Sequence, residues 1–185
     1  MTARLQPATA PYAANVQAAF DRMPGSWKPP FALFTVLARH PELFERFIRG
    51  APAYLPNTHL AIRQREVLLL RVTARCGCDY EWGMRVHYFA DEAGLTAAQV
   101  HATVHGDAGS PCWTAEDAIL IRLADELHDG CTISDEVWHA LRPIFDDEAI
   151  LELLLIAGYY RTVAYLANGL RLRREADVGR PFPQV

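Results

Sequence analysis

The chain has 185 residues, of which 51% are apolar and 22% are charged, and its formal net charge is -4. This composition excludes a disordered chain and predicts one folded domain spanning residues 1–185. The 18 basic residues form no basic block, so nucleic acid is not an expected partner, and the four cysteines are too few for a secreted disulfide framework.

Proline, glycine and capping residues divide the first half of the chain into predicted helices. Gly77 ends a largely apolar segment, and Gly94 suits the position just after a helix. The predicted helices span 11–23, 31–39, 41–50, 61–75 and 78–94.

The second half carries clearer start signals. Thr96 with Gln99 forms a capping-box pattern, and Thr114 and Ser134 are expected to cap the next two helices. Asp146 or Asp147 begins a last long helix at 148–172. No alternating strand pattern persists anywhere. The sequence therefore predicts an all-α protein.

The last predicted helix is apolar on almost every side, with leucine or isoleucine at 150, 151 and 153–156. Such a helix is buried at the centre of a domain or in an oligomer interface. Its apolar run lies between Glu152 and Arg161, too close together for a membrane span. With no visible targeting segment, a cytoplasmic protein without a membrane partner is expected.

The stretch 76–95, CGCDYEWGMRVHYFADEAGL, holds the strongest candidates for chemistry. Positions 78, 81, 82 and 85 share one helical face, which would bring a thiol, a carboxylate and a guanidinium together. Cys78 is expected at the first turn, where free N–H groups favour a thiolate. Glu66 reaches the same place if the two helices fold back on each other. A carboxylate in a dry wall has a raised pKa, which suits proton transfer.

Three segments, 64–96, 114–141 and 148–170, resemble the carboxymuconolactone decarboxylase family, which includes alkylhydroperoxidase D. With the entry segment PGSWKPPFALFTVLARHPELF they cover most of the chain. The resemblance implies a compact AhpD-like helical fold that assembles as trimers or hexamers. In the peroxidase branch a glutamate precedes a Cys-x-x-Cys pair, and a histidine follows. Glu66 matches that glutamate, Cys78 the first cysteine and Tyr80 the tyrosine between the two cysteines.

Two positions depart from the peroxidase pattern. Glu81 replaces the second cysteine, so the local dithiol cycle cannot run, and a Cys76–Cys78 ring would be strained. Arg85 stands at the histidine position and keeps its proton. His87 does not simply take its place, because two residues turn the helix by roughly 200°.

The residues and the resemblance together predict a cofactor-free enzyme that transfers a proton to, or decarboxylates, a small carboxylated substrate, of which a lactone is one candidate. Glu66 and Glu81 are the acid–base candidates, with Cys78 also in the catalytic set. Arg85 is the carboxylate anchor, binding bidentately, or the partner of Glu81 in a structural ion pair. The remaining predicted substrate-site residues are Tyr80, Trp82 and His87.

Two alternatives remain open. One is a peroxiredoxin-like peroxidase that uses Cys78 as a lone peroxidatic thiol. The other is a non-catalytic oligomeric binding protein, favoured if the Glu81–Arg85 pair fills the pocket. No metal is expected, because His101 and His105 have a chelating spacing but no third ligand pattern.

Structural roles are predicted for several other residues. Asp125 and His128 are expected to pair locally. Tyr159 and Tyr160 are expected in the core, in an interface or in the pocket wall. Cys112 and Cys131 are read as free thiols.

Overall fold

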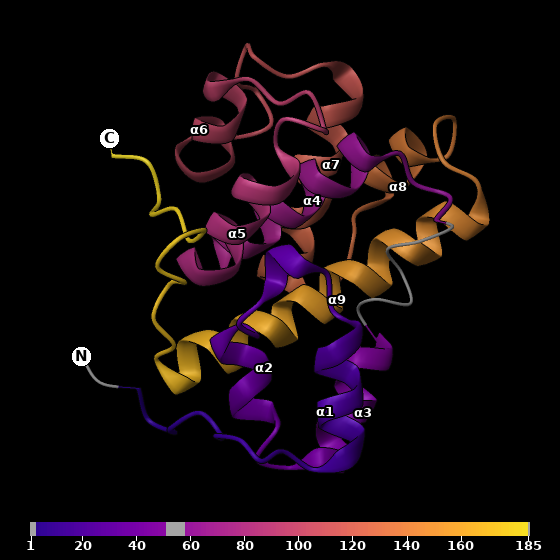
Figure 1. Ribbon diagram of the computed structural model, residues 1–185. Coiled ribbons are helices and arrows are strands. Elements are labelled where there is room, and N and C mark those ends of the chain that lie inside the picture. Colours follow the sequence, from indigo (N-terminus) through magenta and orange to yellow (C-terminus); the bar gives the residue numbers. More distant parts are fainter. Residues whose placement is uncertain (1–2, 51–57, 185) are drawn as a thin grey trace.

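The computed structural model describes residues 3–50 and 58–184 (Figure 1). Within these ranges the chain is helical and has no strand, as the sequence predicted. The helices are α1 (Ala14–Arg22), the 3-10 helix η1 (Gly25–Trp27), α2 (Ala32–Leu37), α3 (Pro41–Gly50), α4 (Ile62–Arg75), α5 (Asp79–Phe89), α6 (Ala97–His105), α7 (Ala115–Gly130), α8 (Asp135–Leu141) and α9 (Asp147–Leu170).

Helix α4 lies at the centre and contacts α5, α6, α7 and α9 (Figure 1). The run Val67–Leu70 is completely buried, because neighbours surround the helix on all sides. The same burial encloses the charged side chains of Arg65, Glu66 and Arg71. A buried charge is costly unless it is paired, so these residues must find partners on adjacent helices.

The capping signals were correct. The Thr96 and Thr114 side chains accept bonds from the backbone N–H groups of Gln99 and Asp117, and Ser134 caps α8. Asp146, the first of the two candidates, caps α9. These side chains occupy N–H groups that the first turn leaves without helical partners, which is why the helices begin there.

Helix ends were predicted less well. Helix α5 ends at Phe89 rather than at Gly94, because a turn over residues 90–94 follows, and Gly94 with φ +63° completes it. Helix α9 ends at Leu170 rather than at 172, because Arg171 adopts a left-handed conformation with φ 55°. The first helix begins at Ala14 and not near Pro11.

Helix α9 is both a core helix and a partly exposed one. Ile150, Leu153 and Ile156 are buried, whereas Leu151 and Leu155 are 60% and 51% exposed. By length and composition α9 could cross a membrane, but 44% of its most apolar window is buried inside this domain. We therefore describe it as the long core helix of a helical domain, and the predicted trimer or hexamer remains a prediction.

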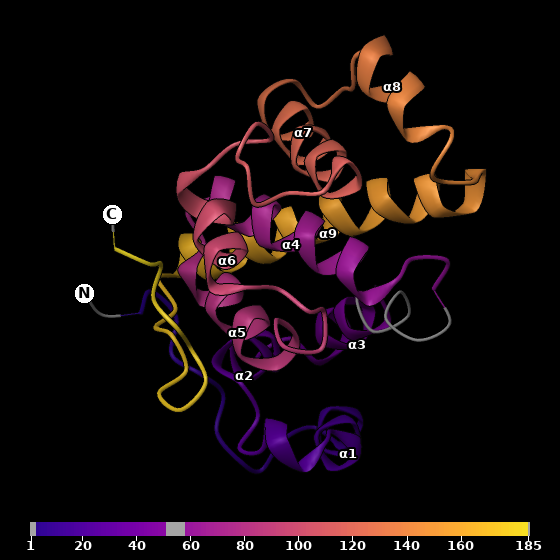
Figure 2. The same ribbon diagram turned by 90° about the horizontal axis from the view of Figure 1, so that it is seen from above.

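Residues after α9 fold back across the outer side of α5, where both views show the C-terminal segment (Figures 1 and 2). Phe182 packs its ring against Trp82 at 5.3 Å between centroids, and Arg174 forms an ion pair with Asp79. The backbone of Arg180 lies so close to Gly83 that a Cβ there would clash with it. The segment is therefore bound along the first half of α5.

Candidate functional site

A buried ion cluster joins α4 to α5, as the sequence hypothesis required. Glu66 is fully buried and accepts bonds from Nε and Nη2 of Arg85 at 2.7 and 2.5 Å. Its Oε1 also accepts a bond from Nε of Arg65 at 2.9 Å. The carboxylate of Glu66 is thus shared by two buried guanidinium groups. The sequence predicted that Glu66 reaches this place, but it predicted Glu81 and not Glu66 as the ion-pair partner of Arg85.

The remaining edge of Arg85 faces Glu81. Nη1 of Arg85 lies 3.5 Å from Oε1 of Glu81, one helical turn earlier on α5. The guanidinium carbon lies 5.0 Å from the ring centroid of Phe89 and 4.6 Å from that of Tyr160, within cation–π range. Glu66 therefore holds one edge of Arg85, and the other edge lies beside Glu81 among aromatic rings.

Burial determines the electrostatics of this cluster. Desolvation raises the pKa of Glu81, partly opposed by Arg85, and the negative charge of Glu66 raises it further. Burial lowers the pKa of Arg85, but the combined effect of Glu66, Tyr160 and Glu81 raises it overall, so the guanidinium stays charged. The raised pKa makes Glu81 the carboxyl of this cluster that best suits a proton donor.

A small pocket opens beside Glu81 and Arg85, with a volume of about 70 Å³. Its walls come from η1, α2, α3, α5 and α9, and most of them are aromatic. Besides Glu81 and Arg85 the lining comprises Trp27, Phe31, Leu33, Phe34, Phe47, Met84, Tyr88, Phe89, Tyr159, Tyr160 and Val163. We call this cavity the aromatic pocket.

Tyr159 and Tyr160 both line the aromatic pocket, one of the alternatives expected from the sequence. The hydroxyl of Tyr159 donates to the backbone carbonyl of Phe47 at 2.8 Å, which ties α9 to α3. Burial raises the pKa of Tyr160 to about 12, although Arg85 opposes this. The Tyr160 phenol is therefore protonated at neutral pH.

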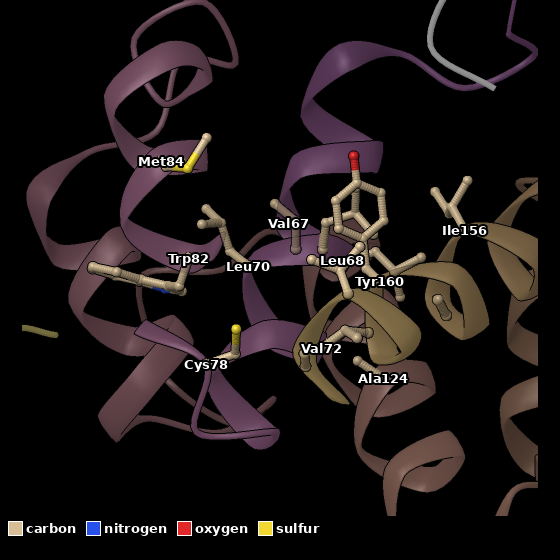
Figure 3. Packing of buried hydrophobic residues seen from close by; sticks show 14 of the residues in the cluster. Val67, Leu68, Leu70, Val72, Cys78, Trp82, Met84, Ala124, Ile156 and Tyr160 are labelled. Carbon is tan, nitrogen blue, oxygen red and sulfur yellow. The ribbon is translucent and has the colours of Figure 1, made fainter. Parts of the chain in front are cut away.

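Cys78 does not have the environment expected of it. It is the N-cap residue of α5 and is completely buried within the apolar cluster shown in Figure 3. Burial raises the pKa of its thiol to about 12, which outweighs the lowering by a backbone hydrogen bond at Glu81. The expectation of a thiolate at this helix terminus was wrong, because desolvation exceeds the effect of the helix N-terminus.

The other predicted substrate-site residues lie around the pocket without lining it. The Tyr80 hydroxyl accepts a bond from the Leu33 backbone N–H at 3.1 Å and donates to Glu175 at 2.6 Å. Trp82 is buried on another face of α5, where its indole N–H donates to Thr103 at 3.0 Å. His87 is exposed. Tyr80 thus supports the α2 wall from behind.

Two further residue pairs lie outside the aromatic pocket. The rings of His101 and His105 lie 4.8 Å apart, but the described residues contain no group of three metal-ligating side chains. Asp125 pairs with Arg71, and the His128 ring lies 3.9 Å from the Cys76 sulfur, so the structure shows other partners for this predicted pair.

Sequence reasoning did not find the aromatic residues of η1, α2 and α3, which form much of the pocket wall. Trp27, Phe31 and Phe34 are close in sequence, and their rings contact one another. No pattern in the sequence near these residues predicts that the aromatic cluster faces α5. Glu175, which binds both Tyr80 and the backbone N–H of Ala32, is likewise far from these partners in the sequence, by 95 and 143 residues.

Comparison with solved structures shows the same helical arrangement in three proteins. An uncharacterized peroxidase-related protein from Silicibacter sp. TM1040 aligns over 98% of this chain and 96% of its own, with a TM-score of 0.75 and 17% identity. A putative antioxidant defence protein AhpD from Agrobacterium tumefaciens aligns over 76% and 96%, with a TM-score of 0.68 and 22% identity. The chain has the AhpD-like fold.

A third solved structure with this AhpD-like fold is the debrominase Bmp8, a cysteine-to-alanine variant in complex with 2,3,4-tribromopyrrole. It aligns over 95% of this chain and 94% of its own, with a TM-score of 0.75 and 16% identity. No family model and no curated protein matches the sequence. At these identities the likeness defines the fold, and the activity must be argued from the site.

Proposed function

We propose that the chain is a cofactor-free enzyme that transfers a proton to or from a small carboxylated substrate in the aromatic pocket. The observation that carries this proposal is the position of Glu81. Its carboxyl has a raised pKa, faces an apolar cavity and lies beside the charged Arg85. A proton donor next to a fixed positive charge, within a largely dry wall, suits carbanion or enolate chemistry.

Each residue of the cluster has a distinct role in this proposal. Nη1 of Arg85 pairs with a negatively charged oxygen of the substrate, because the Nε–Nη2 edge already binds Glu66. Arg85 therefore contacts the substrate through Nη1, whereas the sequence analysis expected two parallel hydrogen bonds from the guanidinium to the substrate carboxylate. Glu66 lies behind Arg85, so we assign it the role of holding the guanidinium.

Decarboxylation is the reaction that uses both groups. The bond from the substrate to its carboxylate carbon breaks, carbon dioxide leaves, and the electron pair moves into an adjacent carbonyl to form an enolate. Glu81 then gives its proton to the enolate carbon and regains one from water. Arg85 stabilises the negative charge that moves from the carboxylate to the enolate oxygen.

Pocket size restricts the substrate. A volume of about 70 Å³ is well below the roughly 300–1,000 Å³ of typical ligand pockets, so the substrate is small or the aromatic walls move on binding. The many aromatic side chains favour a flat, unsaturated molecule. The debrominase Bmp8 with its bound tribromopyrrole supports a small unsaturated ring as a substrate for this fold.

A direct test is deuterium incorporation, followed by NMR in D₂O, into a panel of small carboxylated lactones and unsaturated acids. We expect Glu81→Gln to abolish exchange and decarboxylation. Glu92→Gln, which alters an exposed carboxylate on the turn after α5, serves as the matched control and leaves both unchanged. Equal turnover in Glu81→Gln and the unaltered protein would refute the assignment of Glu81.

A non-catalytic binding protein is the second candidate, and one observation favours it. Glu66 already neutralises Arg85 through two hydrogen bonds, and the cavity beside the pair is small. Under this alternative the same panel binds in calorimetry, yet no deuterium enters any bound compound. The Cys78 peroxidase alternative gains no comparable support, because the Cys78 thiol is buried and protonated.

A further inference from the structure

A second pocket lies between α4, α7 and α9 and shares no lining residue with the aromatic pocket. Its volume is about 190 Å³, and most of its walls are aliphatic. Val72 comes from α4, Ala124 and Leu127 come from α7, and Leu154 and Ala157 come from α9. None of the described residues that line it is aromatic. We call this cavity the aliphatic pocket.

The aliphatic pocket adjoins an outer cavity of about 360 Å³ beside the C-terminal half of α9. Cys76, His128 and Arg161 line both cavities, so they form the border between them. Arg75 and Tyr165 are among the residues that line the outer cavity alone. Of the residues that the structure describes, no aspartate or glutamate lines either cavity. The border therefore favours a negatively charged group.

Arg161 is held at this border by uncharged groups. Its Nη1 donates to the backbone carbonyls of Leu127 and His128 at 3.2 and 3.1 Å, and its Nε donates to the Tyr165 hydroxyl at 2.8 Å. Within residues 3–50 and 58–184, Nη2 of Arg161 has no hydrogen-bond acceptor and its guanidinium forms no ion pair. Arg161 is thus a fixed cation with one nitrogen left to donate to a ligand.

Arg75, the other cation of the outer cavity, already has carboxylate partners. Its Nη2 lies 2.5 Å from Oδ1 of Asp129, and its Nε lies 3.5 Å from Oδ1 of Asp125. These two carboxylates balance the charge of Arg75. Arg161 is therefore the arginine of this region whose charge calls for an anion from outside the chain.

The two other border residues do not oppose an anion. Burial raises the pKa of the Cys76 thiol, although Arg161 and Arg75 lower it, so the thiol is uncharged at neutral pH. Burial, together with the same two arginines, lowers the pKa of His128, so its imidazole is also uncharged. A ligand at the border therefore meets one unbalanced positive charge and no negative one.

We propose that the aliphatic pocket binds a small aliphatic monocarboxylate, which places its carboxylate on Nη2 of Arg161 and its carbon chain between α7 and α9. One guanidinium matches one carboxylate in charge, and a phosphate dianion would need a second cation. The aliphatic walls suit a saturated chain, in contrast to the flat molecule proposed for the aromatic pocket. About 190 Å³ holds roughly six groups of the size of water, at about 30 Å³ each, which fits a chain of about four to six carbons.

The first test uses the unaltered, isotope-labelled protein, titrated with hexanoate and followed by NMR. We expect saturable binding, with nuclear Overhauser effects between the hexanoate chain and the methyl groups of Leu127 and Leu154. Hexanamide, the neutral analogue, should bind about ten-fold more weakly. Equal binding of hexanamide, no saturable binding of hexanoate, or contacts to Leu33 and Val163 of the aromatic pocket instead would each overturn the proposal.

Calorimetry with variants then tests the anchor. We expect Arg161→Gln to weaken hexanoate binding by about ten- to a hundred-fold, and Arg161→Lys, which keeps the charge, to weaken it less. Arg142→Gln is the matched control, because it removes an exposed arginine that pairs with Asp147, and it should leave binding unchanged. Circular dichroism checks that each variant is folded. Unchanged binding in Arg161→Gln would overturn the proposal.

The two pockets can be separated in the same experiment. Hexanoate binding requires neither Glu81 nor Arg85, so this inference does not depend on the function proposed for the aromatic pocket. Arg85→Lys should therefore bind hexanoate as tightly as the unaltered protein. Loss of binding in Arg85→Lys but not in Arg161→Gln would assign the carboxylate to the aromatic pocket and overturn the inference.

Discussion

Arg71 and Arg85 are both buried, and each holds a carboxylate through Nε and Nη2, but their remaining N–H groups meet different surroundings. Arg71 binds Asp125 at 2.6 and 2.9 Å, and its Nη1 donates to the backbone carbonyls of Thr103 and Gly106. Arg71 thus joins α4 to α7 and to the end of α6. Arg85 binds Glu66 in the same way, but its Nη1 edge lies at the aromatic pocket beside Glu81.

The comparison shows that burial and pairing do not identify a functional arginine. Both side chains are at least 94% buried, with exposed fractions of 6% for Arg71 and 3% for Arg85. The difference lies in what the third nitrogen faces. A guanidinium whose third nitrogen binds main-chain carbonyls is a structural tie, whereas one whose third nitrogen borders a cavity can meet a ligand.

The largest expected effect tests the shared carboxylate behind Arg85. Replacing Glu66 by Leu would leave Arg65 and Arg85 buried close together without the carboxylate that binds both. We expect a loss of about 3–5 kcal/mol in the free energy of unfolding, measured by urea denaturation. Leu is close in size, so the loss is electrostatic. A loss under about 1 kcal/mol would show that the pair contributes little.

Arg85→Lys is expected to have the next largest effect, and mainly on function. Lysine keeps the positive charge but cannot bind Glu66 with one edge and face the pocket with the other. We expect kcat/KM for deuterium exchange to fall about a hundred-fold, the size seen when one preorganised donor is removed. An unchanged kcat/KM would exclude Arg85 from the substrate site.

Arg71→Lys is the counterpart and should affect stability instead. It removes the paired bonds to Asp125 and at least one bond to a carbonyl of α6. We expect the free energy of unfolding to fall by about 1–3 kcal/mol, and kcat/KM in the aromatic pocket to stay unchanged. A fall in kcat/KM with little loss of stability would remove the distinction between the two arginines.

The smallest effect concerns the pH dependence of stability. Folding raises the pKa of Glu81 above its ordinary 4.5. At a pH between 4.5 and the raised pKa, the folded protein therefore binds more protons than the unfolded chain. This contribution to the free energy of unfolding is complete below pH 4.5 and is lost as the pH rises through the raised pKa.

Glu81→Gln cannot titrate, so its unfolding free energy should fall less than that of the unaltered protein as the pH rises through this window. Urea denaturation at a series of pH values measures the difference, with Glu92→Gln as the exposed-carboxylate control. Identical slopes for Glu81→Gln and the unaltered protein would contradict the raised pKa.

The sequence predicted the helical class, four helix starts and the proximity of Glu66, Glu81 and Arg85. Each of these depends on local chemistry: a cap satisfies the first turn of its own helix, and helices α4 and α5 adjoin through a short turn at Gly77. Glu81 and Arg85 are one turn apart, so helical periodicity alone brings them together.

The remaining parts of the site depend on contacts between distant segments. Whether Cys78 is a thiolate depends on how completely its neighbours bury it, which the capping position does not reveal. Trp82 lies about 100° around the helix from Glu81, enough for it to face α6 and the C-terminal segment instead of the pocket. The sequence of α5 does not reveal that aromatic residues of α2 and α3 pack against it and form the pocket wall.

The contact between Glu175 and α2 has a consequence for how the protein is made. Glu175 accepts a hydrogen bond from the Ala32 backbone N–H at 2.6 Å. Ala32 is the first residue of α2, the helix that carries Leu33 and Phe34 into the aromatic pocket. A wall built from residues synthesised early is thus secured by a residue synthesised after all the helices. On the ribosome the helical core can begin to form first, and the aromatic pocket reaches its final shape only after residue 175 has emerged.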